Sequence, residues 1–124
     1  KLDLDDTIAA LASPQGAALR GIVRISGPET RSALASLFEP SDSSTWEKSP
    51  RARCHSGRVS LPNCRVPLAA GVYLWPTHRS YTGQPAAELH LVGSGPILEA
   101  ALAAIHSQGV RPARPGEFTL RAFL

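Results

Sequence analysis

Hydrophobic and polar residues alternate along several short segments of the chain, a pattern typical of strands with one buried face. The alternation predicts strands within residues 7–12, 18–26, 87–92 and 110–113, a strand-turn-strand unit over 53–75, and turns at 14–16 and 61–63. In the segment 87–92 Leu89 and Leu91 share one face, so Glu88 is expected on the other. By the same argument, Arg24 shares a face with Arg20 and points away from the core-forming residues of its strand.

Apolar residues at helical spacing predict two main helices. The first follows an S-x-x-E sequence at residues 26–29, which has the form of a capping box, and its apolar stripe runs to Phe38 before Pro40 stops it. The second spans residues 97–109, where Gly109 suits the end of the helix.

Two further segments complete this outline. Residues 41–50 are polar and rich in turn-forming residues, so we expect a loop there. Residues 117–124 follow a Pro-Gly turn and begin a third helix, which offers Phe118, Ala122 and Leu124 to a core. The order of strands and helices indicates one α+β domain with a mixed β-sheet and two main helices.

Composition is that of an ordinary globular domain. The chain carries 13 Lys and Arg against 10 Asp and Glu, and this net charge of +3 does not by itself indicate a nucleic-acid partner. Residues 48–65 hold five basic residues and no acidic one, and a solvated basic loop and hairpin is favoured there over a polyanion site. No apolar segment reaches the ~20 residues of a membrane span. No membrane partner is therefore expected, and a cytoplasmic location is the default.

The sequence shows no metal, nucleotide or catalytic motif. Cys54 and Cys64 flank the predicted turn between the two central strands, and free thiols are favoured over a disulfide. Neither CxxC nor HxxxH spacing is present, so no metal site is expected. The glycine-rich segment 93–95 lacks both GxxxxGK[ST] and GxGxxG, and no nucleophile is recognised beside a base. These patterns support an α+β domain with a candidate ligand face around Arg24 and Glu88.

Five short motifs and one glutamate then occur together. They are DTIAA at 6–10, RISG at 24–27, SYTG at 80–83, Glu88, RPARPGEFT at 111–119 and RAFL at 121–124. Together they resemble the N-terminal domain of the tRNA modification GTPases called MnmE or TrmE. The resemblance implies that residues 1–118 form this domain and residues 119–124 begin a connecting helix. It also implies that the chain is a piece of a longer protein, whose helical and GTPase domains are absent here.

The resemblance carries further expectations about fold and function. The family's domain is similar to half of the folate-binding fold of glycine-cleavage T-proteins, forms a homodimer, and binds a one-carbon tetrahydrofolate such as 5-formyltetrahydrofolate near the dimer interface. The whole protein works with a flavoprotein partner, MnmG or GidA, on the wobble uridine of certain tRNAs. GTP, magnesium and potassium belong to the absent GTPase domain. No catalytic residue is assigned in this chain, since its sequence shows no catalytic constellation.

The resemblance also assigns candidate cofactor-binding residues. Arg24 and Glu88 match family positions associated with folate binding, and less direct candidates are Tyr81, Thr82, Gly83, Arg114 and Glu117. The Glu88 carboxylate could accept two hydrogen bonds from the adjacent donors of a pterin edge, and Arg24 could hold a carboxylate or ring oxygen of the ligand. The alternative is that both are surface residues of a half-exposed sheet, or that they pair with each other.

The chain departs from the family pattern beside Glu88. The family usually reads SYTGED where Gln84 and Pro85 follow SYTG here, and His-Gly-Gly where Val92 and Ser94 flank a glycine. These departures leave open a dimerisation scaffold that has lost folate binding. A third alternative, a folate-dependent aminomethyl transferase relative, would need a second similar half, and the sequence shows no internal repeat.

Overall fold

The computed structural model describes residues 4–12 and 20–124, to which all statements below refer. The strands are β1 (Ile8–Leu11), β2 (Arg20–Ser26), β3 (Phe38–Pro40), β4 (Arg53–Val59), β5 (Leu68–Trp75), β6 (Ala86–Val92) and β7 (Arg111–Pro112). The helices are α1 (Thr30–Ala35), α2 (Ser43–Lys48), α3 (Gly95–His106) and α4 (Glu117–Phe123). The turn expected at residues 14–16 and the start of the strand expected from residue 18 lie outside the described residues.

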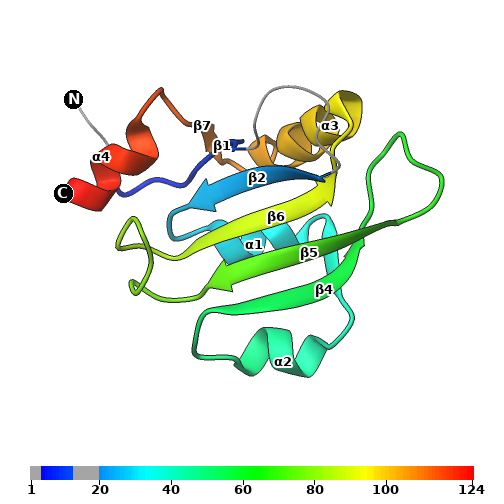
Figure 1. Ribbon diagram of the computed structural model, residues 1–124, viewed down its shortest axis with the longest axis horizontal. Coiled ribbons are helices and arrows are strands. Elements are labelled where there is room, and N and C mark those ends of the chain that lie inside the picture. Colours follow the sequence, from blue (N-terminus) through cyan, green and yellow to red (C-terminus); the bar gives the residue numbers. More distant parts are fainter. Residues whose placement is uncertain (1–3, 13–19) are drawn as a thin grey trace.

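One sheet of seven strands in the order β3-β4-β5-β6-β2-β1-β7 organises the described chain (Figure 1). Its neighbours pair antiparallel except β1 and β7, which are parallel. The sheet is therefore mixed, which confirms the α+β prediction. Two helices, α3 and α4, have seven or more residues, with 12 and 7 respectively.

The core lies between one face of the sheet and the helices α1 and α3, which lie behind the sheet in Figure 1. Val23, Leu74 and Leu89, from three neighbouring strands, are at most 1% exposed and pack in one cluster with Leu34 of α1 and Ile105 of α3. Full burial of each such side chain stabilises the fold by about 1.5–3 kcal/mol. The alternate positions of the same strands therefore face the other way, and this side carries Glu88 as predicted.

The prediction of a capping box at residues 26–29 is wrong. The Ser26 hydroxyl lies 2.7 Å from the Thr82 hydroxyl instead of capping a helix, and α1 begins only at Thr30. Glu29 takes the N-cap position without a side-chain cap, while its backbone N–H donates to the Thr7 hydroxyl at 2.8 Å. Ser26 therefore bonds to the loop that precedes β6 and not to α1.

The outline also missed two elements between residues 36 and 52. The first helix ends at Ala35, not near Phe38, and Phe38 begins β3. Part of the expected loop is α2, where the Asp42 side chain caps the helix by accepting from the Thr45 N–H at 3.0 Å. Trp46 is the helix's one buried residue, so its sequence has no apolar period for a pattern search to detect.

Other expectations can be compared directly with the structure. Cys54 and Cys64 are free, as predicted, and Cys54 faces Tyr73 across the β4–β5 ladder. No group of three or more metal-ligating side chains gathers among the described residues. None of the helices in this part of the chain has the length and apolar character needed to cross a membrane.

Candidate functional site

A hollow of about 360 Å³ opens between β2, β6, the β5–β6 loop and α4. Its walls combine aromatic rings, hydroxyl groups and one ion pair. The lining residues are Arg24, Ile25, Ser26, Trp75, Tyr81, Thr82, Ala86, Ala87, Glu88, Phe118 and Thr119. This volume and mixed lining are typical of small-molecule sites. We call this hollow the pocket.

Arg24 and Glu88 face each other across the β2–β6 ladder. The Arg24 Nη2 and Nε atoms donate to Glu88 Oε2 at 3.0 and 3.3 Å, and His90 Nε2 lies 3.3 Å from the other carboxylate oxygen. The alternative in which the two residues pair with each other is therefore the observed arrangement. A ligand that binds Glu88 must displace Arg24, whose side chain is 40% exposed and so has room to move.

The β5–β6 loop supplies the opposite rim. Thr82 is only 7% exposed, and its hydroxyl bonds Ser26 beneath the loop. Tyr81 is 65% exposed and its hydroxyl lies 3.5 Å from the Thr119 hydroxyl of α4. Gly83 has a φ of +76°, a left-handed conformation that turns the loop back toward β6 without itself lining the pocket.

Helix α4 closes the pocket with Phe118, whose ring lies 5.9 Å from the Arg24 guanidinium. None of the three residues expected to enter a core is fully buried, and Phe118 and Ala122 are half-buried. Leu124 is 75% exposed, whereas the buried residues of α4 are Glu117 and Arg121, one turn apart. The helix is thus attached through charged side chains.

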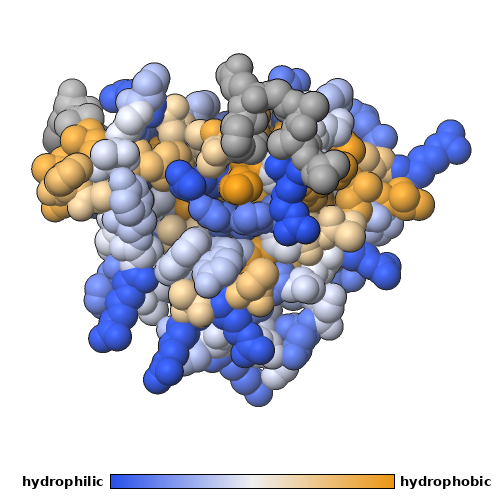
Figure 2. Space-filling view, viewed as in Figure 1, coloured by the Kyte–Doolittle hydropathy of each residue, from blue (hydrophilic) through white to orange (hydrophobic). Residues whose placement is uncertain are grey.

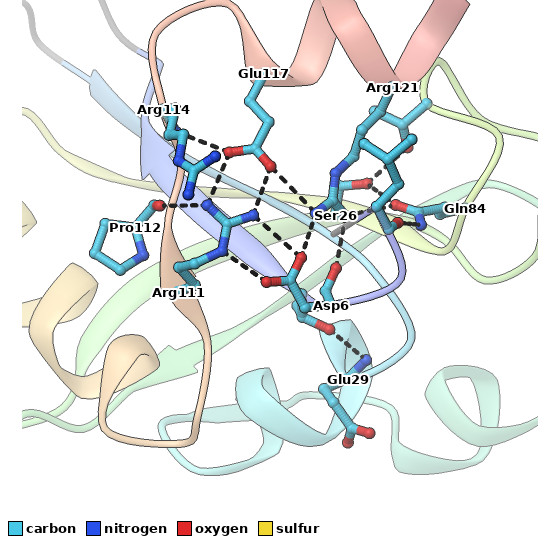
Figure 3. A network of polar contacts seen from close by, with 12 residues as sticks. Asp6, Ser26, Glu29, Gln84, Arg111, Pro112, Arg114, Glu117 and Arg121 are labelled. Atoms are coloured by element: carbon cyan, nitrogen blue, oxygen red, sulfur yellow. Dashed lines mark hydrogen bonds and ion pairs between the residues drawn. The ribbon is translucent and has the colours of Figure 1, made fainter. Parts of the chain in front are cut away.

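Four residues form what we call the charge network: Asp6, Arg111, Glu117 and Arg121 (Figure 3). Arg111 bridges the two carboxylates, with its Nη2 2.6 Å from Glu117 Oε2 and its Nε 2.6 Å from Asp6 Oδ2. The hydrogen bond from Arg111 lowers the pKa of Glu117 to about 2 and also holds the pKa of Asp6 below its usual value. Two arginines and two carboxylates therefore stay charged and balanced beside the pocket.

Gln84 connects the charge network to the pocket. Its side-chain oxygen accepts from Arg121 Nη1 at 2.9 Å and from the Ser26 hydroxyl at 3.2 Å, while its amide nitrogen donates to the Leu4 carbonyl at 2.5 Å. The departure from the family pattern at this position thus fills a defined structural role. It joins α4 to the floor of the pocket.

The structure brings four of the seven candidate residues into the pocket: Arg24, Glu88, Tyr81 and Thr82. Arg114 lines a neighbouring hollow of about 320 Å³, which shares Arg24 and Phe118 with the pocket. Glu117 instead lies in the charge network, from which it positions α4.

The pocket is also lined by four residues that the sequence patterns did not indicate as site residues: Ser26, Trp75, Phe118 and Thr119. Trp75 lies two residues after Tyr73 on β5, so the two side chains share one face of the strand, and their rings lie 4.7 Å apart. This spacing was the sequence signal for Trp75. Phe118 and Thr119 stood in the RPARPGEFT motif, but only the position of α4 against β2 makes them part of a pocket.

Comparison with known proteins matches almost the whole chain. A family model described as GTP-binding protein TrmE N-terminus matches residues 7–124. The chain is 48% identical over 123 residues to the tRNA modification GTPase MnmE of Rhodopirellula baltica, covering 98% of this chain and 26% of that protein. It is 45% identical over 121 residues to the protein of the same name in Syntrophus aciditrophicus, with 98% and 26% covered. The chain therefore spans about a quarter of the length of these curated relatives.

Proposed function

Because the chain belongs to the family of GTP-binding protein TrmE N-terminal domains, we propose that its pocket binds a one-carbon derivative of tetrahydrofolate such as 5-formyltetrahydrofolate. The observation that carries the proposal is the combination of one carboxylate with three aromatic side chains around one hollow. These are Glu88, Trp75, Tyr81 and Phe118.

The chemistry of the pocket fits such a ligand. A pterin ring is flat and stacks on aromatic faces, and its edge presents adjacent N–H donors that a carboxylate accepts side by side. Glu88 supplies that carboxylate once Arg24 turns away, and Arg24 then remains close enough to pair with an anionic part of the ligand. The bound cofactor would supply a one-carbon unit, while the residues of this chain bind and orient it.

The open face of the sheet supports a homodimer. Tyr73 and Val92 are 41% and 48% exposed, and Tyr73 is the cross-strand neighbour of Glu88. A second copy of the chain on this face would bury apolar surface directly beside the pocket. We therefore place the dimer interface of our proposal over β5 and β6.

The relatives' names extend the proposal to a longer protein. They are tRNA modification GTPases, and this chain matches about a quarter of their length. The proposed whole protein modifies tRNA in the cytoplasm together with a flavoprotein partner. GTP, magnesium and potassium act in a GTPase domain outside this chain.

Isothermal titration calorimetry with 5-formyltetrahydrofolate tests the proposal directly. We expect saturable binding by the purified chain, and weaker binding by Arg24→Ala through loss of a separate contact. Sedimentation of the same samples tests dimerisation. A dimer that binds no folate would support the scaffold alternative and overturn the cofactor assignment.

A further inference from the structure

Basic residues are concentrated in one continuous part of the chain. Residues 48–87 contain six Lys and Arg and no Asp or Glu, whereas the other 84 residues contain seven Lys and Arg against ten Asp and Glu. Residues 48–87 therefore carry a formal charge of +6 and the other residues a charge of −3, although the net charge of the whole chain is only +3. Such an asymmetry points to a polyanionic partner more strongly than the net charge does.

Part of this charge gathers around another hollow, of about 630 Å³, between the α2–β4 loop and the β5–β6 loop. Arg51, His78 and Arg79 line it together with two prolines, and all three cationic or titratable side chains are exposed. No carboxylate of the described residues lines this hollow, and no ion pair in the described part of the chain involves Arg51 or Arg79. We call it the basic hollow.

The two loops lie at the same end of the sheet as α4, with the β5–β6 loop between α4 and the α2–β4 loop (Figure 1). Figure 2 shows hydrophilic side chains projecting from this lower part of the molecule, over α2 and the adjoining loop. Three basic residues lie in the β4–β5 hairpin: Arg53 begins β4 beside the α2–β4 loop, whereas Arg58 and Arg65 lie toward the far end, and Arg58 faces the acidic Glu39 in the β3–β4 ladder.

The β5–β6 loop joins the basic hollow to the pocket. Its first half carries His78 and Arg79 into the hollow, and its second half carries Tyr81 and Thr82 into the pocket. Tyr81 is 65% exposed and stands two residues from Arg79, so a cation and an accessible aromatic ring share one loop. This pairing suits RNA, whose phosphates bind guanidinium groups and whose unpaired bases stack on aromatic rings.

We propose that the basic hollow binds the phosphate backbone of RNA, with Arg51 and Arg79 as its principal phosphate ligands. The inference rests on the proposed place of this chain in a tRNA-modifying protein and extends it to a surface. It places an RNA strand on the loop that also forms the rim of the pocket. The bound RNA would thus lie next to the cofactor.

A matched pair of double variants tests this surface. Arg51→Gln/Arg79→Gln removes two charges from the loops that form the basic hollow, and Arg58→Gln/Arg65→Gln removes the same charge from the far end of the β4–β5 hairpin. Binding of a fluorescein-labelled anticodon stem-loop RNA is measured by anisotropy over a range of salt concentrations. We expect the first variant to bind roughly 10-fold or more weakly and to reduce the slope of log K against log salt by about 1.4–1.8, since each lost phosphate contact contributes about 0.7–0.9. The second variant should stay within about threefold of the parent.

Equal losses in the two double variants would mean diffuse charge and would overturn the basic hollow as a site. Binding of phosphatidylglycerol vesicles in place of RNA would also overturn the basic hollow as an RNA site. Titration with 5-formyltetrahydrofolate separates this inference from the cofactor proposal. Selective loss of RNA binding in Arg51→Gln/Arg79→Gln supports the RNA surface even if the parent chain binds no folate, whereas intact RNA binding in that variant overturns it even if folate binds.

Discussion

Glu88 is the residue on which the cofactor proposal turns. Its carboxylate is 22% exposed and already accepts from Arg24, so the folded chain satisfies it without a ligand. A ligand that offers two adjacent donors can replace Arg24, because a carboxylate accepts two hydrogen bonds side by side. In the proposed function, a ligand therefore takes the place of Arg24 at Glu88.

For Glu88→Gln we expect folate affinity to fall about 5- to 150-fold, because one acceptor becomes a donor that faces a donor of the pterin. Thermal stability should stay near that of the parent, since Arg24 remains partly in solvent. Calorimetry and a thermal melt measure the two effects. Glu99→Gln, an exposed residue of α3, is the matched control. Unchanged affinity in Glu88→Gln would show that the carboxylate does not bind the pterin.

His55 is a buried titratable residue away from the pocket. It is 5% exposed, its ring meets Trp46 edge-on at 5.0 Å, and its Nε2 has no hydrogen-bond partner among the described residues. Burial, and then the charges of Arg53 and Arg31, lower the pKa of His55 below its ordinary value. The folded state therefore favours the neutral ring, and protonation favours unfolding.

We expect the free energy of unfolding to decrease as pH falls through the ordinary histidine pKa of about 6.5. His55→Phe should lose this part of the pH dependence, because it keeps an aromatic ring against Trp46 but removes the proton site. Urea unfolding at about pH 7.5 and about pH 5.5 compares the variants. The exposed His78→Gln serves as control, and a pH dependence that His55→Phe shares fully with the parent would contradict the assignment.

At the level of elements, α4 is held by ion pairs rather than by an apolar stripe. Glu117 is 3% exposed and bonds both Arg111 and Arg121, so removal of its charge leaves two guanidinium groups short of a partner. Breaking one member of a buried ion pair costs about 3–5 kcal/mol. Among the described residues, the hydrophobic core cluster contains none from α4.

Glu117→Gln should accordingly open α4 locally while α3 stays protected, which hydrogen exchange of the backbone amides resolves element by element. Because the pKa of Glu117 is lowered from 4.5 to about 2, its stabilising contribution is complete above about pH 4.5 and is lost as pH falls toward 2. The exposed Glu47→Gln on α2 is the control. Equal protection of α4 in Glu117→Gln and the parent would refute the role of the charge network.

Two glycines on paired strands offer a second test at this scale. A Cβ atom at Gly57 would lie 2.2 Å from the Glu39 carbonyl oxygen and 2.7 Å from the Phe38 ring, whereas at Gly71 the nearest atom is 3.9 Å away. We expect Gly57→Ala to destabilise the protein by about 1–3 kcal/mol through overpacking between β3 and β4. Gly71→Ala should be neutral or slightly stabilising. Comparable urea midpoints for the two variants would contradict this packing argument.

For the whole molecule, the sequence and the proposed function predict a chain without nucleotide chemistry of its own. It contains no GxxxxGK[ST] loop to cradle phosphates. Purified chain incubated with GTP and magnesium should release phosphate only at the rate of the buffer. Turnover above that background, proportional to the concentration of chain, would require a phosphate site that the sequence does not reveal.

Local patterns along the sequence determined much of this architecture. The alternation in β6 set the face of Glu88, and the apolar spacing predicted α3, although the helix ends at His106 with Ser107 as its C-cap and not at Gly109. Short motifs such as RISG and SYTG indicated the family that the comparison confirms. These inferences succeeded because each depends on residues that are neighbours in the chain, where backbone geometry alone decides which side chains share a face.

Tertiary structure alone decided how the site is assembled. Arg24 and Glu88 are 64 positions apart, and only the β2–β6 register makes them partners. Asp6 and Arg121 are 115 positions apart, and their ion pair, not an apolar stripe, fixes α4 over the pocket. Trp46 shows the same limit at the level of an element, since its buried ring attaches α2 through contacts with Phe38 of β3, His55 of β4 and Arg31 of α1. Such contacts depend on packing between distant segments, which no local period encodes.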